Sequence, residues 1–173
     1  MGPVVRVVLC FRAKFWEYEP EMLDLSFLFT DHPLFPTWWT SNPLPYPTLT
    51  GWAAGHHALA LRGKSHDEVI DSAAQALAEI MEVEAAKVRA QLVAGHAHDW
   101  LEDAFSCGAY SYTTVGGVNA AQILAAPVAD TLYFAGEATN IHGYGGTVHG
   151  AMETGGRAAR EVLGKANLTA DER

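Results

Sequence analysis

The chain has few cysteines, no excess of basic residues and no long hydrophobic run, and each shortage excludes a class of protein. Two cysteines among 173 residues are too few for a disulfide scaffold and favour a reducing compartment, so we predict a cytoplasmic location. Eleven Lys and Arg against twenty Asp and Glu give a net charge of −9 without a basic cluster, which disfavours a nucleic-acid or membrane-surface partner. The apolar run Val4–Phe11 is short and is interrupted by Arg6, so neither a signal peptide nor a membrane span is expected.

The chain also lacks the glycine fingerprint of a dinucleotide-binding domain. No predicted strand is followed by G-x-G-x-x-G with an acidic residue about 20 positions later. The glycines near Gly143 do not replace it, since Val148 occupies the third glycine position after Gly143 and Gly145. A length of 173 residues and 49% hydrophobic content still allow a globular domain with a substantial core.

Apolar, β-branched and aromatic runs predict three strands before the first long helix. They cover Val4–Phe11, Leu23–Phe29 and Leu49–Ala54, and an acidic turn around Glu17–Glu21 joins the first two. Proline is frequent in Asp31–Pro47, so this stretch is expected to be loop or isolated edge structure, because proline fixes φ and removes a ladder donor.

The clearest helix signal begins at Ser65. Ser65 and Glu68 have the spacing of a capping box, which is worth about 1 kcal/mol. Apolar residues then recur on one helical face, at Val69, Ile70, Ala73, Leu77 and Ile80. Further on we expect a short helix over Glu84–Arg89, followed by a strand over Gln91–His98.

The segment from 132 to 163 has the most informative pattern, LYFAGEATNIHGYGGTVHGAMETGGRAAREVL. Leu132–Ala135 has the length and aromatic content of a buried strand, which Gly136 ends. The glycines of segment 143–146 permit close backbone approach, and a helix beginning at about Thr147 would aim free N–H groups into that turn. Such a unit binds an anion, or a carbonyl that gains negative charge.

The order of residues in this segment resembles the C-terminal flavin-binding motif of flavin-dependent amine oxidases, the group of monoamine oxidases, polyamine oxidases and flavin histone demethylases. The resemblance rests on Gly-Glu-Ala-Thr at 136–139 and on Gly-Thr-Val-His-Gly-Ala at 146–151. It extends upstream, in family order, to VVRVVLCFRAKFW at 4–16, LTGWAAG at 49–55 and WLEDAFSCGAYSYTTVGG at 100–117. Family members are considerably longer, so the resemblance implies the C-terminal part of such an oxidase without its dinucleotide-binding half.

This resemblance implies an α/β (α+β) fold. Residues 1–130 would form a portion of the substrate domain, a mixed β-sheet with packed helices. Residues 131–164 would form the final strand, turn and helix of an FAD-binding domain, and the tail 165–173 is expected to be frayed. The implied reaction is hydride transfer from a small-molecule amine to FAD, hydrolysis of the imine and reoxidation by oxygen. The chain is expected to be inactive without the missing half, which a second chain would supply, or else to self-associate.

The resemblance assigns the flavin contacts to five residues. The backbone N–H of Val148 would face the pyrimidine carbonyl of the ring, and Glu137 would accept hydrogen bonds from cofactor hydroxyls near the pyrophosphate. Trp100 would pack near the flavin, while Gly136 and Thr147 belong to the strand end and the helix start of the motif. Without the resemblance, this segment reads as an ordinary strand-to-helix turn and Trp100 as a core aromatic residue.

Two further positions, Tyr110 and Ala109, bear on the amine cage and on the flavin link. Tyr110 aligns with one wall of the aromatic cage that flanks the amine in monoamine oxidases, while Thr147 occupies the second wall, so the cage is half formed. Ala109 stands where monoamine oxidases carry the cysteine that links to the flavin, which makes FAD non-covalent here. Without the resemblance, Tyr110 is equally consistent with an ordinary residue of the hydrophobic core.

Arg6 stands where most of the family places a lysine that holds a water against the reactive flavin nitrogen. A guanidinium can hold a water or a carboxylate, but it cannot act as a base near neutral pH. Arg6 is therefore compatible with a substrate that carries an acidic group or with altered oxygen reactivity. It is also compatible with an ordinary strand residue whose side chain reaches solvent.

Two other functions stay open. The chain could be a non-catalytic protein that uses the pocket or an exposed docking face for binding, or a structural remnant without ligand. We predict no metal site, because His96 and His98 share a strand face without a third ligand at a diagnostic spacing.

Overall fold

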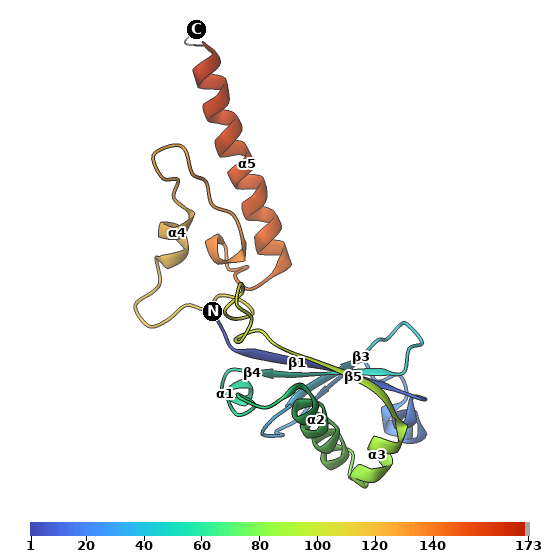
Figure 1. Ribbon diagram of the computed structural model, residues 1–173. Helices are drawn as coiled ribbons and strands as arrows, with labels where there is room; N and C mark the ends of the chain where they lie inside the picture. The colour runs from blue at the N-terminus through green and yellow to red at the C-terminus, as the bar shows by residue number, and fades with distance from the viewer. Residues whose placement is uncertain (172–173) are drawn as a thin grey trace. The chain divides into compact units, whose positions relative to one another are not determined.

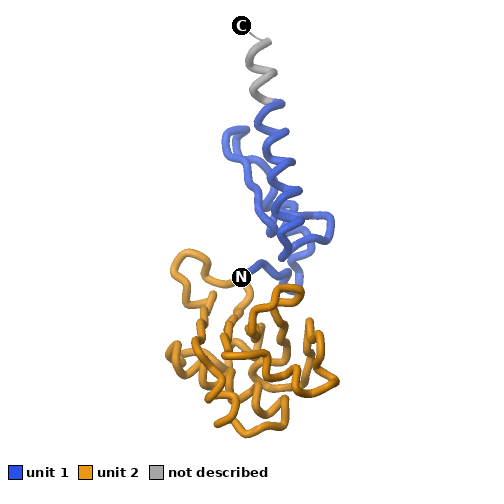
Figure 2. Tube along the Cα trace, turned by 90° about the vertical axis from the view of Figure 1, so that its right-hand side faces the viewer, with its two compact units in different colours: residues 1, 110–173 blue, residues 2–109 orange. Residues whose placement is uncertain are grey.

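The computed structural model describes the backbone of residues 1–171 and the side chains of residues 1–164. The chain divides into two compact units, residues 2–109 and residue 1 with residues 110–173 (Figure 2). The fold is a mixture of helices with a five-stranded sheet, which confirms the expected class. The division near residue 110 lies before the expected boundary at residue 130. That boundary concerned the cofactor-binding segment and stays a prediction.

The unit of residues 2–109 is built on an antiparallel sheet with the strand order β2-β3-β4-β1-β5. The strands are β1 (Val4–Phe11), β2 (Phe27–Phe29), β3 (Thr37–Thr40), β4 (Thr48–Ala54) and β5 (Leu92–Asp99). Strand β1 lies between β4 and β5, so that Val7 pairs with Gly51 on one side and with Ala97 on the other. The predicted strands β1, β4 and β5 are confirmed, while β2 covers only the end of the predicted run.

Strand β3 shows that the expectation of loop or edge structure over Asp31–Pro47 was wrong for its middle. Thr37–Thr40 is an inner strand that pairs with β2 and β4. The strand forms because its four residues contain no proline, so every N–H in it can donate to the ladder. Trp38 on this strand is fully buried, and a side chain at Gly51 would come within 2.9 Å of its ring. Gly51 therefore makes room for the indole.

Helices cover one face of this sheet. They are α1 (His56–Leu59), α2 (His66–Ile80) and α3 (Ala85–Gln91), and Figure 1 shows α2 and α3 on the same side of the strands. Two 3-10 turns, η1 (Phe15–Tyr18) and η2 (Pro20–Met22), occupy the predicted acidic turn. The core between these layers includes Leu9, Trp16, Phe35, Leu49 and Leu77, all at most 1% exposed.

The predicted capping box starts α2. The Ser65 hydroxyl accepts a hydrogen bond from the Glu68 N–H at 3.3 Å, and the Glu68 carboxylate accepts one from the Ser65 N–H at 2.7 Å. Of the predicted apolar face, Val69, Ala73 and Leu77 are buried, as expected. The helix lies close to β5, where a side chain at Gly95 would come within 2.7 Å of Ile70.

The second unit consists of a long helix and the loops that pack on it. Its elements are α4 (Ala120–Ala125), the 3-10 turn η3 (Glu137–Thr139) and α5 (Val148–Asp171). None of the helices described here is long and apolar enough to cross a membrane. The frayed tail expected over 165–173 falls where side chains are not described, and its last two residues lie outside the described backbone. It stays a prediction.

The predicted buried strand Leu132–Ala135 does not form. Within residues 110–171 this run makes a single bridge, between Val128 and Leu132, and Leu132 is 56% exposed. A strand needs a neighbouring strand to pair its backbone groups, and this stretch of chain offers none. The prediction of a buried strand over Leu132–Ala135 was therefore wrong for this chain.

Helix α5 packs on its own unit through polar residues. The Thr154 hydroxyl accepts a hydrogen bond from the Gly136 N–H at 3.0 Å. Arg157 donates to the carbonyl oxygens of Ala125 at 3.0 Å and Phe134 at 2.7 Å. The apolar repeat of the helix faces outward instead, with Val148, Met152 and Leu163 at 74%, 73% and 62% exposure.

Candidate functional site

Five of the predicted site residues gather in the turn before α5. Glu137 is at its centre, because its carboxylate bonds two segments that lie far apart in the sequence. Oε1 accepts a hydrogen bond from the Ser111 N–H at 2.8 Å, and Oε2 accepts one from the Ser111 hydroxyl at 2.7 Å. Oε2 also accepts the N–H of Gly146 in the glycine turn. The predicted residues Tyr110, Gly136 and Thr147 are direct chain neighbours of Ser111, Glu137 and Gly146, and Val148 follows Thr147 at the start of α5.

Tyr110 packs directly on the glycine turn. A side chain built at Gly146 would meet the Tyr110 ring at 3.8 Å, so the ring lies against the bare backbone. Gly146 has a φ of +73°, a left-handed conformation that favours glycine. The structure thus brings Tyr110 beside Gly146, the residue that precedes Thr147, and Tyr110 and Thr147 are the two positions that the resemblance assigned to the amine cage.

The start of α5 presents free backbone donors. Thr147 caps the helix, since its hydroxyl accepts the Gly150 N–H at 3.0 Å and its carbonyl accepts the Ala151 N–H at 3.1 Å. The N–H groups of Val148 and His149 have no hydrogen-bond acceptor among the described residues. These groups carry the positive end of the helix dipole, so they form a donor site for a carbonyl or an anion.

The surroundings of Glu137 keep it ionised. Partial burial works to raise its pKa, but the hydrogen bonds from the Ser111 hydroxyl, the Ser111 N–H and the Gly146 N–H outweigh it. The pKa of Glu137 is therefore lower than that of an ordinary glutamate. The carboxylate fixes the turn as an anion, and its predicted contact with cofactor hydroxyls stays a prediction.

Sequence reasoning missed the polar residues that hold this turn in place. Besides Ser111, they are Asn140, Glu153, Thr154 and Arg157. Asn140 donates to Glu153 at 2.7 Å and accepts the N–H groups of His142 and Tyr144 at 3.0 and 2.9 Å. Thr154 and Arg157 are one helical turn apart on α5, and that spacing of two hydrogen-bonding residues was the available signal.

Arg6 and Trp100 form a second cluster, in the unit of residues 2–109. Arg6 lies on the sheet face opposite the helices, paired with Trp52 on β4 and His98 on β5. The Trp100 ring meets the His98 ring edge-on at 4.4 Å. A hollow of about 180 Å³ is lined by Arg6, Val8, His96, Ala97, His98 and Trp100. The predicted site residues therefore sort into two groups, one in each unit.

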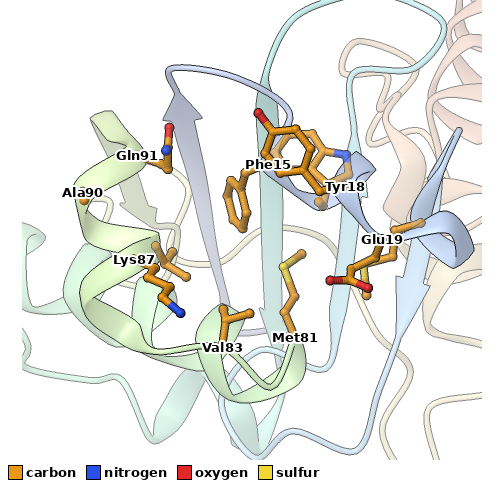
Figure 3. A pocket seen from close by; sticks show the side chains of 11 residues that line it. Phe15, Tyr18, Glu19, Met81, Val83, Lys87, Ala90 and Gln91 are labelled. Atoms are coloured by element: carbon orange, nitrogen blue, oxygen red, sulfur yellow. The ribbon is translucent and has the colours of Figure 1, made fainter.

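A larger cavity lies on the helix side of the same unit and contains none of the predicted site residues. It measures about 360 Å³, and Figure 3 shows Phe15 and Tyr18 opposite Met81 and Val83. Lys87 and Glu19 also line it. Across the described part of the chain, no three His, Cys, Asp or Glu side chains are grouped as metal ligands would be.

Comparison with known proteins identifies the class. The profile of a family described as flavin containing amine oxidoreductase matches residues 1–163. The chain belongs to this flavin-containing amine oxidase family. It is 31% identical over 165 residues to lysine-specific histone demethylase 1 homolog 3 of Arabidopsis thaliana, covering 94% of the chain and 10% of that protein.

Two further relatives show that the chain matches only part of a longer protein. It is 26% identical over 167 residues to human amine oxidase [flavin-containing] B, covering 94% of the chain and 31% of the enzyme. Cyclohexylamine oxidase from Brevibacterium oxydans IH-35A shares the fold, with a TM-score of 0.78 at 19% identity over 96% of this chain and 36% of that one. The chain thus spans about a third or less of each relative.

Proposed function

We propose that this chain supplies the flavin-ring end and part of the substrate pocket of an FAD-dependent amine oxidoreductase. A dinucleotide-binding half, in a second polypeptide or in a longer product, would complete the enzyme. The observation that carries the proposal is the helix start beside Tyr110, where the N–H groups of Val148 and His149 have no acceptor among the described residues. Membership of the amine oxidase family supports it.

The residues present fit the ring end of FAD. The N–H of Val148 would donate to a ring carbonyl and stabilise negative charge there, worth about 0.3–1 kcal/mol, or more when partly buried. Tyr110 and Trp100 would offer aromatic faces to the amine and the ring, and Ala109 offers no nucleophile for a covalent link. FAD, when bound, would accept the hydride equivalent from a small-molecule amine.

The exposed apolar face of α5 fits a docking surface for the missing half. Val148, Met152 and Leu163 lie on it, and Val128 and Leu132, elsewhere in the same unit, are 52% and 56% exposed. Apolar surface of this kind usually meets a partner. The chain covers 31% of human amine oxidase B, so most of the length of that enzyme is left for a partner that would include the dinucleotide-binding part.

Reconstitution with a supplied half tests the proposal. The chain is co-expressed with the dinucleotide-binding half of a longer relative, purified as a complex and examined for bound flavin by its visible absorbance. We expect flavin to be retained and to be bleached by amines without oxygen. A stable complex that carries no flavin would contradict the proposal.

One substitution targets the helix start itself. Val148→Pro removes a single N–H at the first helical position, where proline is well tolerated, and Val148→Ala keeps that N–H. We expect Val148→Pro to weaken flavin binding by roughly two- to fivefold, in line with a helix-end interaction. Equal flavin affinity in the two variants would remove this N–H from the site.

A further inference from the structure

The uncovered face of the sheet is arranged as two rows of side chains that run across all five strands. The strand pairings place Phe29, Thr37, Trp52, Arg6 and His98 in one row, and Phe27, Trp39, Thr50, Val8 and His96 in the next. Directly paired residues on one face lie about 4.5–5.5 Å apart, so each row is a continuous line of neighbours.

One end of this face is aromatic. Phe27 and Phe29 stack at 6.1 Å, Phe27 contacts Trp39 at 6.3 Å, and Trp39 contacts Trp52 at 6.1 Å. Phe27 and Phe29 are 61% and 73% exposed although they are large and apolar. The β2–β3–β4 end of the face therefore offers ring surfaces to a ligand.

The other end carries basic side chains. Arg6, His96 and His98 are exposed there, and neither row contains an acidic residue, although the whole chain has twenty acidic residues and a net charge of −9. A carboxylate from the loop after β5 reaches His98, with Asp103 Oδ2 3.6 Å from His98 Nε2. The Arg6 side chain has no hydrogen bond or ion pair to any residue that the structure describes.

We infer that this face binds a small molecule that has an aromatic group at one end and a carboxylate at the other, with Arg6 as the partner of the carboxylate. The guanidinium fork matches a carboxylate in a bidentate geometry. Trp52 on β4 and Arg6 on β1 are direct neighbours, and Trp39 is two strand spacings, or about 10 Å, from β1. In a molecule with a phenyl ring on a two- or three-carbon chain, the carboxylate and the ring are about one strand spacing apart, so the ring would lie over Trp52 and reach the edge of Trp39.

The inference deepens the proposed function and rests on it only for the reacting group. In an amine oxidase, a carboxylate site on this face makes the substrate an amine that also carries a carboxylate and an apolar or aromatic side chain. The anion site itself depends on the sheet alone, so it is testable without flavin.

The test uses the 173-residue chain with its tryptophan indoles labelled for NMR. Three probes of one shape are titrated, the anion 3-phenylpropionate, the neutral 3-phenylpropan-1-ol and the cation 3-phenylpropylamine. We expect the anion to shift the indole signals of Trp39 and Trp52 and to bind roughly fivefold more tightly than the alcohol, as for an exposed charge pair. The amine should bind most weakly.

Variants assign that preference to Arg6. Arg6→Gln should abolish the preference for the anion, and Arg6→Lys should keep part of it, because the charge remains without the fork. Arg12→Gln is the matched control, since Arg12 is an exposed arginine just beyond the end of β1 and its loss changes the net charge equally. Arg12→Gln should leave the preference intact.

Equal binding of the three probes, or no indole shift with any of them, would overturn the inference. Loss of the anion preference in Arg12→Gln as well as Arg6→Gln would overturn it too, because the effect would then be one of overall charge. These results are separate from the flavin experiment. If the complex fails to retain flavin, the proposed function is contradicted but a measured anion preference still supports this inference. If the complex oxidises amines but the sheet face shows no anion preference, only this inference is contradicted.

Discussion

Glu137 accepts two hydrogen bonds from Ser111, one from its N–H at 2.8 Å and one from its hydroxyl at 2.7 Å. The same carboxylate accepts the N–H of Gly146, so one anion joins the segment that carries Tyr110 to the turn that precedes α5. Tyr110 rests on Gly146 as a result. The position of the aromatic ring beside the helix start therefore depends on the charge of Glu137.

This dependence predicts a loss of order in acid. The pKa of Glu137 is lowered in the folded chain, so the folded state binds fewer protons than the unfolded state between its folded pKa and the ordinary value of 4.5. The stabilisation is fully present above pH 4.5 and is lost as the pH falls through the folded pKa. Amide hydrogen exchange should show the protection of Ser111 and Gly146 falling over this range.

The Gly136 amide is the internal control for that measurement. It donates to the Thr154 hydroxyl at 3.0 Å, and a hydroxyl does not titrate in acid. Glu137→Gln should reduce the protection of Ser111 and Gly146 at neutral pH and remove its acid dependence. Protection of these two amides that stays constant to well below pH 4.5 would contradict this role of Glu137.

Two glycines of α5 should respond in opposite ways to alanine. A methyl group at Gly150 would overlap the carbonyl of Tyr144, whereas nothing lies within 4 Å of the same position at Gly155. We expect Gly150→Ala to destabilise the turn and helix start by about 1–3 kcal/mol, as overpacking does. Gly155→Ala should stabilise the helix by roughly 0.5–1 kcal/mol. Helical circular dichroism on heating measures both, and the same sign for both variants would refute the packing of this turn.

The sequence predicted elements whose signals are local. The Ser65–Glu68 capping box and the apolar run Val4–Phe11 depend on neighbouring residues, and both elements formed where expected. Strand β3 was missed because flanking prolines obscured four proline-free residues that pair on both sides. The strand predicted over Leu132–Ala135 was wrong for the opposite reason. Its apolar pattern is typical of a buried strand, but a strand also requires a partner strand to pair with.

Of the candidate site, the sequence predicted only the residues that the family motifs contain at assigned positions. The resemblance pointed to Tyr110, Glu137 and Thr147, and the structure gathers them around one turn. It did not reveal Ser111, whose bonds to Glu137 join residues 26 positions apart. Nor did it reveal that α5 uses Thr154 and Arg157 for packing and leaves its apolar repeat exposed, because spacing defines a face without saying what that face meets.

Arg6 should limit amine oxidation in a reconstituted enzyme. Its permanently charged fork differs from a compact ammonium, which holds a single water and can shift its pKa when buried. With an amine that carries no carboxylate, Arg6→Lys is expected to raise amine-dependent flavin reduction or reoxidation by oxygen by about tenfold, equivalent to ~1.4 kcal/mol of activation free energy. Stopped-flow measurements of the two half-reactions separate these steps. Unchanged rates in a flavin-loaded complex would remove Arg6 from the site.

The apolar face of α5 should make the isolated chain self-associate. Met152 and Leu163 are 73% and 62% exposed, and an isolated chain has only other copies to cover them. Light scattering should show oligomers at high protein concentration, and Met152→Gln with Leu163→Gln should shift the chain towards monomer. Arg160 is an exposed polar residue on the same helix, so Arg160→Gln is the control. This substitution should leave the oligomeric state unchanged. A well-behaved monomer at high concentration in the unaltered chain would count against this surface.

An FAD titration tests the central claim most directly. If the chain holds only the ring end of FAD, contacts to the adenine, the ribose and most of the pyrophosphate come from the missing half. The isolated chain should then bind FAD with a dissociation constant weaker than micromolar, and adding the dinucleotide-binding half should tighten binding by orders of magnitude. Visible absorbance or quenching of flavin fluorescence follows both titrations. A sub-micromolar dissociation constant for the isolated chain, unchanged by the added half, would contradict the account.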